Sequence, residues 1–302
     1  MARLFTEGFE GGDLGNMSSL SGDTSVIAGG RGGSYQARLR GSSAFISKTI
    51  ANVAEIYYRF VHSKTSDGSH FLTGWYNNSI LNGNLLAGRL VLGSTPGTDG
   101  LISLYVGSSL VASASIVCHA ADNHAWEVHV KIALSGNIDV KYDGTTIIAY
   151  AGDTRNGLTD INKITFNAES DTIGFNFDDL AFNDTTGAVD NSWCGDGGVL
   201  AALVPTGVGT YSDLTASAGN AYQCVDDVPQ NGDTDYIYTS TVGHKSTFAM
   251  SNLPALLAGA SIARVWTEIV ARETAAVGAK IATFFRSGAT DIQGSDQTLT
   301  LA

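Results

Sequence analysis

The sequence predicts an all-β protein made of two antiparallel β-sandwich modules, at residues 1–186 and 187–302. Glycine supplies 36 residues against four prolines, and only 15% of the residues are charged. Such a composition is typical of many tight turns and few surface helices. Apolar and polar residues alternate with a period of two through much of the chain, which indicates strands with one buried face. The composition changes after residue 186, so a second β-rich module is expected there.

Alternating segments separated by turn signals fill the first module. Residues 53–62 place Ile56, Tyr58 and Phe60 on one face and the charged Arg59 on the other. Further strands are expected at residues 101–106, 126–134, 138–142, 146–150 and 161–166. The pair Asp143-Gly144 is the clearest hairpin signal, because Asp-Gly favours the two-residue turn that joins antiparallel strands.

Two further segments have the pattern of the opening and closing strands of one sandwich. These are Phe-Thr-Glu-Gly-Phe-Glu at residues 5–10 and Phe-Asn-Phe-Asp-Asp-Leu-Ala-Phe-Asn-Asp at residues 175–184. The order of the pieces, from the Trp126-x-Val-x-Val strand through Asp143-Gly144 to this close, resembles the second half of concanavalin A-like (laminin-G-like) jelly rolls. The resemblance spans about residues 4–184 and implies a jelly roll for residues 1–186.

The same resemblance implies a structural calcium site between the first and last strands. Calcium takes six to eight oxygen ligands from carboxylates and carbonyls. The matching carboxylates are Glu7, Glu10 and Asp178 or Asp179. The alternative is a surface Asp179 with Asp178 capping backbone amides. No other cofactor is expected.

The second module resembles the C-terminal module of tailed-bacteriophage virion proteins. The resemblance rests on four segments in order: Trp-Cys-Gly-Asp at 193–196, Leu-Val-Pro-Thr at 203–206, Tyr-Gln-Cys-Val-Asp-Asp-Val-Pro at 222–229, and Asp-Thr-Asp-Tyr-Ile at 233–237. Cys194 stands where an aliphatic residue is usual, and the module is expected to be incomplete at its C-terminus. Residues 261–272 fit a helix or a strand by spacing, and their β-branched content favours a strand. A short helical turn is expected at 254–258.

Catalytic patterns are not found in the sequence. Glycoside hydrolases occur among concanavalin A-like folds, and retaining ones need two carboxyl groups about 5–5.5 Å apart. Glu127 beside His129, and Glu268 with Glu273, have the wrong spacing or point to opposite faces. There is no Gly-x-Ser-x-Gly motif, and the glycine-rich run at 29–33 lacks the Lys-Ser/Thr ending of a phosphate loop. We therefore expect no enzyme activity.

Aromatic side chains on strands make glycan binding an alternative. Sugar recognition uses exposed rings with polar groups beside them. Trp75, Tyr76, Trp126 and Tyr142 are residues of the right type. The competing interpretation is that they are core or interface residues, as Trp and Tyr in sandwich strands usually are.

Charge and cysteine content bound the partners and the compartment. The net charge is −12 and no two basic residues are adjacent, so a nucleic-acid partner or an anionic membrane surface is not expected. We expect neither a signal peptide nor a membrane span, because the first residues pass into a strand pattern and no window has the long apolar run that either would need. Cys118, Cys194 and Cys224 are interpreted as buried or idle thiols, with a Cys194–Cys224 disulfide as the alternative.

Together these features predict a non-enzymatic structural component of a tailed-phage virion, such as a decoration, fibre or tail-attached protein. It would be assembled in the bacterial host cytoplasm and would contact other virion proteins. A homo-oligomer is expected, and a trimer is the usual form for fibres and capsid-surface knobs. One alternative is a receptor-binding module for host-surface glycans, and another is a polysaccharide-degrading enzyme.

Overall fold

The structure of the protein is a computed structural model that divides into two compact units. The first unit comprises Met1–Leu203 and Asp227–Asn231, and the second comprises Val204–Asp226 and Gly232–Ala302. The described residues are 3–31, 35–64, 70–77, 85–94, 99–118, 122–168, 174–195, 198–229, 231–232, 234–252, 262, 265, 267, 269–274 and 278–299.

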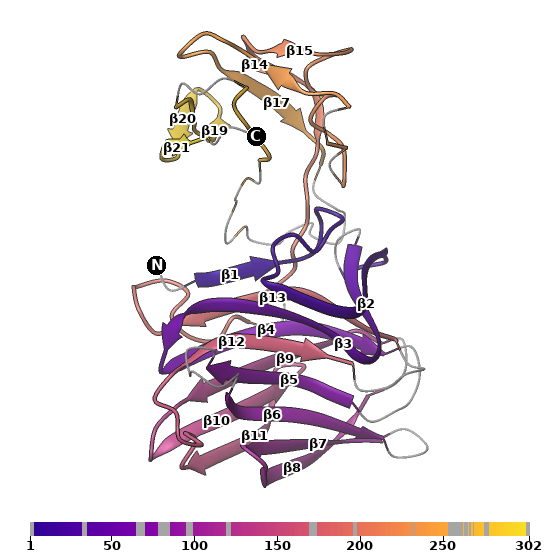
Figure 1. Cartoon of the computed structure of the whole chain (residues 1–302), viewed down its shortest axis with the longest axis vertical. Helices are drawn as coiled ribbons and strands as arrows, with labels where there is room; N and C mark the ends of the chain where they lie inside the picture. Colours follow the sequence, from indigo (N-terminus) through magenta and orange to yellow (C-terminus); the bar gives the residue numbers. More distant parts are fainter. Residues whose placement is uncertain are drawn as a thin grey trace. The chain divides into compact units, whose positions relative to one another are not determined.

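The described residues of the first unit form one antiparallel sheet of thirteen strands (Figure 1). Its main path runs β11-β10-β9-β4-β13-β3-β12-β5-β6-β7-β8, with β1 paired to β13 and β2 paired to β3. The strands are β1 (Arg3–Glu7), β2 (Ser19–Ala28), β3 (Tyr35–Val53), β4 (Glu55–Lys64), β5 (His70–Asn77), β6 (Leu85–Ser94), β7 (Asp99–Val106), β8 (Ser109–Val117), β9 (His124–Lys131), β10 (Gly136–Tyr142), β11 (Thr145–Gly152), β12 (Ile161–Asn167) and β13 (Gly174–Asp184).

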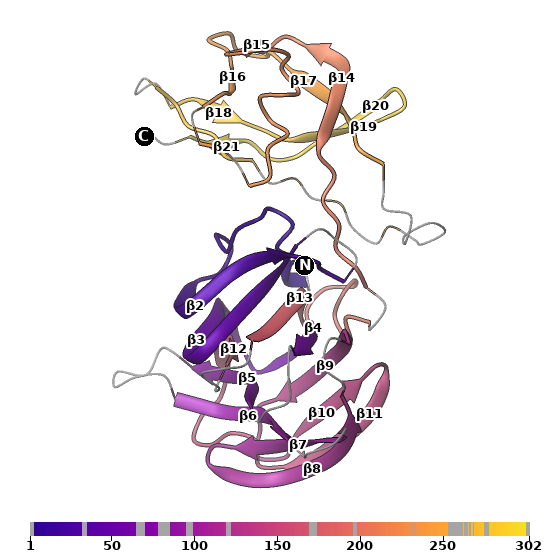
Figure 2. The same ribbon diagram turned by 90° about the vertical axis from the view of Figure 1, so that its right-hand side faces the viewer.

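The sheet curls until strands from its two ends meet. Strand β11 lies at one end of the strand order and β8 at the other, yet these two strands contact each other. The curl, visible in both views (Figures 1 and 2), lets one sheet enclose a core as the two layers of a sandwich do. The first unit is thus all-β and built from one curved antiparallel sheet, which agrees with the jelly roll expected from the sequence.

Aromatic side chains fill the centre of this core. Phe60 on β4 stacks on Trp126 of β9, with ring centroids 6.1 Å apart, and meets Phe166 of β12 at 5.1 Å. Phe177 of β13 packs against Phe166 at 5.2 Å. All four rings are fully buried. The predicted inward face of residues 53–62 is confirmed, because Ile56 is buried together with Phe60.

Two predicted pairings are present in the sheet. The opening strand β1 pairs with the closing strand β13 in antiparallel register. Strands β10 and β11 form the hairpin at Asp143-Gly144. Both turn residues have positive φ, 47° and 78°, as a type I′ turn requires. Strands β2, β3, β5, β6 and β8 were not predicted.

The second unit consists of short paired strands (Figure 2). Its described residues form four two-stranded ladders, β14-β17, β15-β16, β18-β21 and β19-β20. The strands are β14 (Pro205–Ser212), β15 (Thr215–Ala216), β16 (Ile237–Tyr238), β17 (Ser246–Met250), β18 (Lys280–Ile281), β19 (Phe284–Ser287), β20 (Thr290–Gln293) and β21 (Gln297–Thr298). The unit is β-rich, and these ladders alone do not make the sandwich expected from the sequence.

Two predicted elements of the second unit differ from the structure or lie outside it. The described residues between Ile262 and Arg272 belong to no strand. The helical turn expected at 254–258 lies outside the described residues.

The described residues also bear on membrane spans and thiols. No helix long and apolar enough to cross a membrane occurs among them. All three cysteines are free thiols, and Cys118 and Cys224 are buried, which agrees with the interpretation of idle thiols and not with a disulfide.

Candidate functional site

A cluster of buried polar side chains lies on one face of the neighbouring strands β4, β9 and β10. Side chains alternate between faces along a strand, so Tyr57 and Arg59 of β4 lie on the face opposite Phe60. Cross-strand pairing sets Tyr57 beside His129 of β9 and Arg59 beside Glu127. We call this region, with Asp139 and its neighbours on β10, the polar face.

His129 is the centre of the polar face. Its Nε2 lies 2.9 Å from a carboxylate oxygen of Glu55, and its Nδ1 lies 3.1 Å from a carboxylate oxygen of Asp139. The Tyr57 ring stacks on the imidazole with centroids 4.1 Å apart and planes within 3°. Asn137 also contacts Nδ1, at 3.0 Å. Both ring nitrogens are therefore engaged by neighbouring side chains.

The chain that follows β13 returns across the polar face. We call residues 190–195 the cover segment. Its Trp193 ring meets Tyr57 and His129 edge-on, at centroid distances of 5.4 and 5.9 Å. Lys141 of β10 places its Nζ 3.8 Å from the centre of the Trp193 ring. The indole thus lies over the histidine and its partners.

Hydrogen bonds tie the cover segment to the sheet. The Gly195 amide donates to a Glu127 carboxylate oxygen at 2.6 Å, and the Arg59 guanidinium donates to the Gly195 carbonyl at 3.0 Å. Arg59 also donates to the Asp179 carbonyl at 3.0 Å. A Cβ at position 198 would lie 1.7 Å from an Arg59 nitrogen, so a larger residue there would force the Arg59 guanidinium out of its present position.

This arrangement holds buried charges by mutual contact. Burial lowers the pKa of Arg59, and the neighbouring Asp179 carboxylate opposes that effect. Burial raises the pKa of the Cys194 thiol to about 12, so this cysteine stays protonated and is a poor nucleophile near neutral pH. Glu127 and His129 are both nearly buried. The polar face therefore has the chemistry of a packed internal interface more than that of an open acid–base site.

The four carboxylates predicted to bind calcium are all buried. Glu7 accepts from the Phe9 amide at 2.6 Å. Asp178 accepts from the Arg31 amide through one oxygen and from the Asp179 amide through the other, both at 2.7 Å. Glu10 accepts from the Tyr35 amide at 3.3 Å.

Asp179 departs from the surface position considered for it. Its side chain is fully buried, one oxygen accepts from the Leu200 amide at 2.7 Å, and the other has no hydrogen-bond partner. Its φ of 51° accompanies the bulge between Asp178 and Ala181 in the ladder with β4. Burial, and next the charge of Asp179, raises the pKa of Asp178 to about 8.

These carboxylates, as arranged, do not fit a calcium cage. Calcium requires six to eight oxygen ligands converging on one point. In the part of the chain that the structure describes, no group of three or more His, Cys, Asp or Glu side chains is placed to hold a metal ion. The hydrogen bonds of Asp178 match the alternative in which it caps backbone amides.

The four predicted glycan-contact residues fall into two groups by burial. Trp75 and Trp126 are 0% exposed and belong to the core, so neither presents a ring to a sugar in this structure. Tyr76 and Tyr142 are half-buried. The Tyr142 ring packs on Trp126 at 4.8 Å, and its hydroxyl donates to the Val117 carbonyl.

Sequence reasoning missed the cover segment and its partner Arg59. Trp193 and Cys194 were assigned to the start of the second module, whereas residues up to Leu203 belong to the first unit. The only sequence signal was a charged residue, Arg59, on a strand face expected to be wet. Nothing in the local pattern shows that a segment over 130 residues later covers it.

Comparisons with known proteins show distant similarity to several β-proteins. No protein-family model matches the chain, and no curated protein matches it. An alginate lyase, Aly36B, aligns with 62% of this chain and 94% of its own, at 12% identity and a TM-score of 0.45. Endo-β-1,4-glucuronan lyase from the fungus Trichoderma reesei aligns with 64% of this chain and 100% of its own, at 12% identity and 0.43. Cip1, a cellulose-induced protein, aligns with 63% of this chain and 100% of its own, at 15% identity and 0.46. At these identities and scores no activity is carried over to this chain.

Proposed function

We propose that this protein is a non-enzymatic structural component of a tailed-phage particle and acts through protein–protein contacts. The observation that carries the proposal is the surface of the second unit. Among the described residues, Cys224 is the only buried apolar residue of that unit. Large apolar surfaces left open on a β-rich unit mark sites of protein contact.

The exposed apolar side chains of the second unit are large and numerous. They include Val208, Tyr236, Tyr238, Val242, Met250, Ile262, Val265, Ile269, Val270, Phe285 and Ile292. Fully covering one such side chain contributes about 1.5–3 kcal/mol. A partner that covers several of them would be held strongly without any catalytic site.

The covered polar face of the first unit supports a non-enzymatic role. Glu127 and His129 are the acid–base pair nearest to a catalytic type in the sequence. The cover segment lies over both, through the Gly195 amide and the Trp193 ring. A general acid or base must come within hydrogen-bond reach of its substrate, and here those positions are occupied by the chain itself.

The particle assignment rests on the sequence resemblance of residues 193–237 to phage virion modules. It is tested by mass spectrometry of purified particles combined with chemical cross-linking. The expected result is this chain in the particle, cross-linked to another particle protein. Consistent absence of the chain from purified particles would overturn the assignment.

The non-enzyme proposal has its own test. Purified protein is incubated with host polysaccharides, and chain length is followed by size-exclusion chromatography. No depolymerisation is expected. Cleavage that is lost in Glu127→Gln and kept in a surface control, Asp153→Asn, would show that the polar face is catalytic.

A further inference from the structure

One stretch of the first unit's sheet is nearly free of carboxylates. Strands β12, β5, β6 and β7 lie side by side (Figure 1), and the second half of β3 pairs with β12. None of β3, β12, β5 and β6 contains Asp or Glu, and β7 has only Asp99, at its first residue. The polar face, in contrast, contains Glu55, Glu127 and Asp139. These strands therefore depart from the net charge of −12 that the whole chain carries.

Cross-strand pairing places one row of side chains across this stretch of sheet. Ser47 of β3 pairs with Thr165 of β12, and Thr165 pairs with Gly74 of β5. Gly74 pairs with Arg89 of β6, and Arg89 pairs with Tyr105 of β7. Directly opposite residues of antiparallel strands share a face of the sheet. The residues on either side of Thr165 belong to the core, so the row lies on the opposite, outward face.

Two cations lie against aromatic rings on this outward face. The Arg89 guanidinium carbon lies 4.9 Å from the centre of the Tyr105 ring. The Lys163 Nζ lies 5.8 Å from the centre of the Phe45 ring and 6.0 Å from that of Tyr76. Each of these side chains is half-buried, so each presents part of its surface outward. We call this region the cationic face, defined by Phe45, Ser47, Arg89, Tyr105, Lys163 and Thr165.

The cationic face leaves charge and hydrogen-bonding capacity unused within the chain. Burial lowers the pKa of Lys163 and no neighbouring carboxylate opposes that effect, whereas Glu7 opposes it at Lys48. The hydroxyl groups of Ser47 and Thr165 are buried and make no hydrogen bond. Because buried polar groups in proteins are normally satisfied, their partners are expected from outside the chain.

We infer that the cationic face docks onto the acidic surface of another protein of the particle. The inference rests on the proposed structural function and adds the chemistry of one partner. The centres of protein interfaces are enriched in Tyr, Phe and Arg and depleted in Asp and Glu, as this face is. Carboxylates of the partner would pair with Lys163, and such complementary charge favours one partner surface over others.

The cationic face is large enough for a specific contact. Five strands about 4.8 Å apart, each about seven residues long at about 3.3 Å per residue, cover about 550 Å². The two partners together would bury about 1,100 Å², which is close to the lower limit of standard protein interfaces. The area therefore fits a contact that is repeated many times in one particle and strengthened by that repetition.

Other polyanions fit this face less well. Sugar recognition by stacking needs open ring faces, and the guanidinium of Arg89 lies over the ring of Tyr105. Nucleic acids are held through several phosphate contacts, whereas the described residues of the cationic face supply two cations, Arg89 and Lys163. An acidic protein surface requires neither stacking nor a long row of cations.

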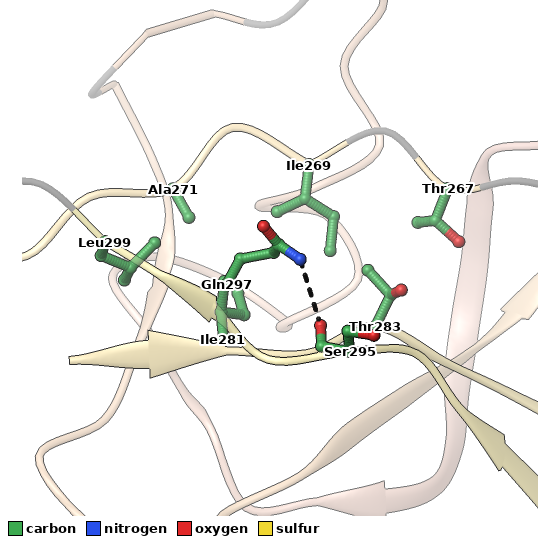
Figure 3. Close-up of a pocket in the computed structure, with 8 residues that line it drawn as sticks. All are labelled: Thr267, Ile269, Ala271, Ile281, Thr283, Ser295, Gln297 and Leu299. Atoms are coloured by element: carbon green, nitrogen blue, oxygen red, sulfur yellow. Dashed lines mark hydrogen bonds between the residues drawn. The ribbon is translucent and has the colours of Figure 1, made fainter. Parts of the chain in front are cut away.

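The groove of the second unit lacks the charge for a contact of this kind (Figure 3). It has a volume of about 470 Å³. Half of its lining is polar, through Thr267, Thr283, Ser295 and Gln297, and none of the lining residues is charged. Its composition therefore selects no particular partner.

The first test cross-links intact particles that contain the full chain. A carbodiimide joins an amine directly to a carboxylate in contact with it, so Lys163 is expected to be joined to Asp or Glu of another particle protein. Lys131 is the reference, because it already pairs with Glu55 at 3.7 Å on the polar face. Lys131 is expected to link only within the chain. Mass spectrometry of the linked peptides distinguishes the two results.

Matched variants remove the same charge from the two faces. Incorporation of Lys163→Gln into particles is expected to fall at least tenfold, because the partner's carboxylate would be left buried and unpaired. Lys131→Gln should be incorporated within about twofold of the wild type, since exposed ion pairs contribute little. Circular dichroism checks that both variants fold. Equal incorporation of Lys163→Gln, or no intermolecular link at Lys163, would overturn the inference.

A titration of the isolated full chain needs neither particles nor variants. Poly-L-glutamate, polygalacturonate and duplex DNA are added at low salt and their binding is measured by calorimetry. Poly-L-glutamate should bind at least as tightly as the other two, and it should protect Lys163, but not Lys131, from acetylation. Tighter binding of polygalacturonate or DNA would assign the face to a glycan or a nucleic acid instead. Equal acetylation of Lys163 with and without poly-L-glutamate would also overturn the inference.

The two proposals can fail separately. A chain that is absent from particles, but whose Lys163 is protected by poly-L-glutamate, would retain the acidic docking surface and lose the particle assignment. A chain found in particles, with no intermolecular link at Lys163 and full incorporation of Lys163→Gln, would retain the particle assignment and lose this inference.

Discussion

The two units of this protein are both β-rich, but the first buries its apolar side chains in a core and the second leaves many of them exposed. In the first unit one long sheet curls and encloses an aromatic core around Phe60 and Trp126. In the described part of the second unit, four separate two-stranded ladders leave apolar residues such as Val270 and Ile292 exposed. The difference teaches that alternation specifies strands, whereas a core requires enough paired strands to close on one another.

The two units also differ in what covers their surfaces. In the first unit, Trp193 and Gly195 of the cover segment lie over the polar face. The second unit leaves its groove uncovered in the described residues. Under the proposed function, the exposed apolar side chains of the second unit are the surface that a partner covers.

The largest expected effect is loss of a core aromatic in the first unit. Phe60→Ala removes contacts with Trp126, Phe166 and Phe177 and should lower the free energy of unfolding by about 3–5 kcal/mol. Denaturant unfolding followed by tryptophan fluorescence measures it. A loss below about 1 kcal/mol would mean that the first unit does not depend on this core.

Removing the indole of the cover segment should have an intermediate effect. Trp193→Ala deletes the contacts with Tyr57, His129 and Lys141, and we expect a loss of about 1–3 kcal/mol because the ring is only half-buried. Trp193→Phe, which keeps a ring, should lose less. Equal stability of Trp193→Ala and the wild type would show that the cover segment does not hold the polar face closed.

The pH dependence of stability sharpens the account of the buried carboxylates. Asp178 has an ordinary pKa of 3.8 when unfolded and about 8 when folded. Between these values the folded state keeps a proton that the unfolded state has lost, so this group lowers stability as pH rises from about 4 to 8. Below that window both states are protonated, and the contribution is constant.

Asp178→Asn should therefore flatten the fall in stability between pH 5 and 8. The substitution also weakens a hydrogen bond that Asp178 accepts from a backbone amide. That loss lowers stability by the same amount at every pH in this window, so it does not change the slope of the stability curve. Asp153→Asn, at an exposed carboxylate with a pKa lowered to about 2 by Arg155, serves as the control and should leave the slope in this window unchanged. Parallel curves for Asp178→Asn and the wild type would contradict the raised pKa.

The smallest effect is expected at an exposed apolar residue of the first unit. Leu134→Asp should change the free energy of unfolding by less than about 0.5 kcal/mol, because Leu134 is a surface residue outside the core cluster. Thermal unfolding at several protein concentrations measures it. A large loss would show that the first unit also hides a contact surface.

Much of the first unit could be predicted from sequence. Strict alternation identified β4 and β9 to β12, and Asp143-Gly144 identified their hairpin. Strand β3 (Tyr35–Val53) was missed because a Gly-Ser-Ser run at residues 41–43 interrupts its alternation, and its pairing with β2, β12 and β13 overrides that weak local preference. Long-range pairing of this kind has no local signal.

The candidate site was harder to predict. The sequence predicts that Arg59 and Glu127 lie on strand faces. It does not predict that Trp193 and Gly195 cover those faces, because the path of the chain after β13 has no local sequence signal. Likewise, Trp75 and Trp126 have the residue type of sugar-binding rings, and only burial distinguishes that role from a core role. In the second unit, alternation cannot tell whether the same chain or another copy covers an apolar face.

Amide hydrogen exchange of the full chain tests the contrast between the two units most directly. Amides of β4, β9 and β13 should be strongly protected, because these strands lie inside one sheet that encloses the core, whereas amides of β14 to β21 should exchange faster in the isolated chain. Protection of β14 to β21 equal to that of β4, β9 and β13 would contradict the account of a second unit whose apolar side chains are left for a partner to cover.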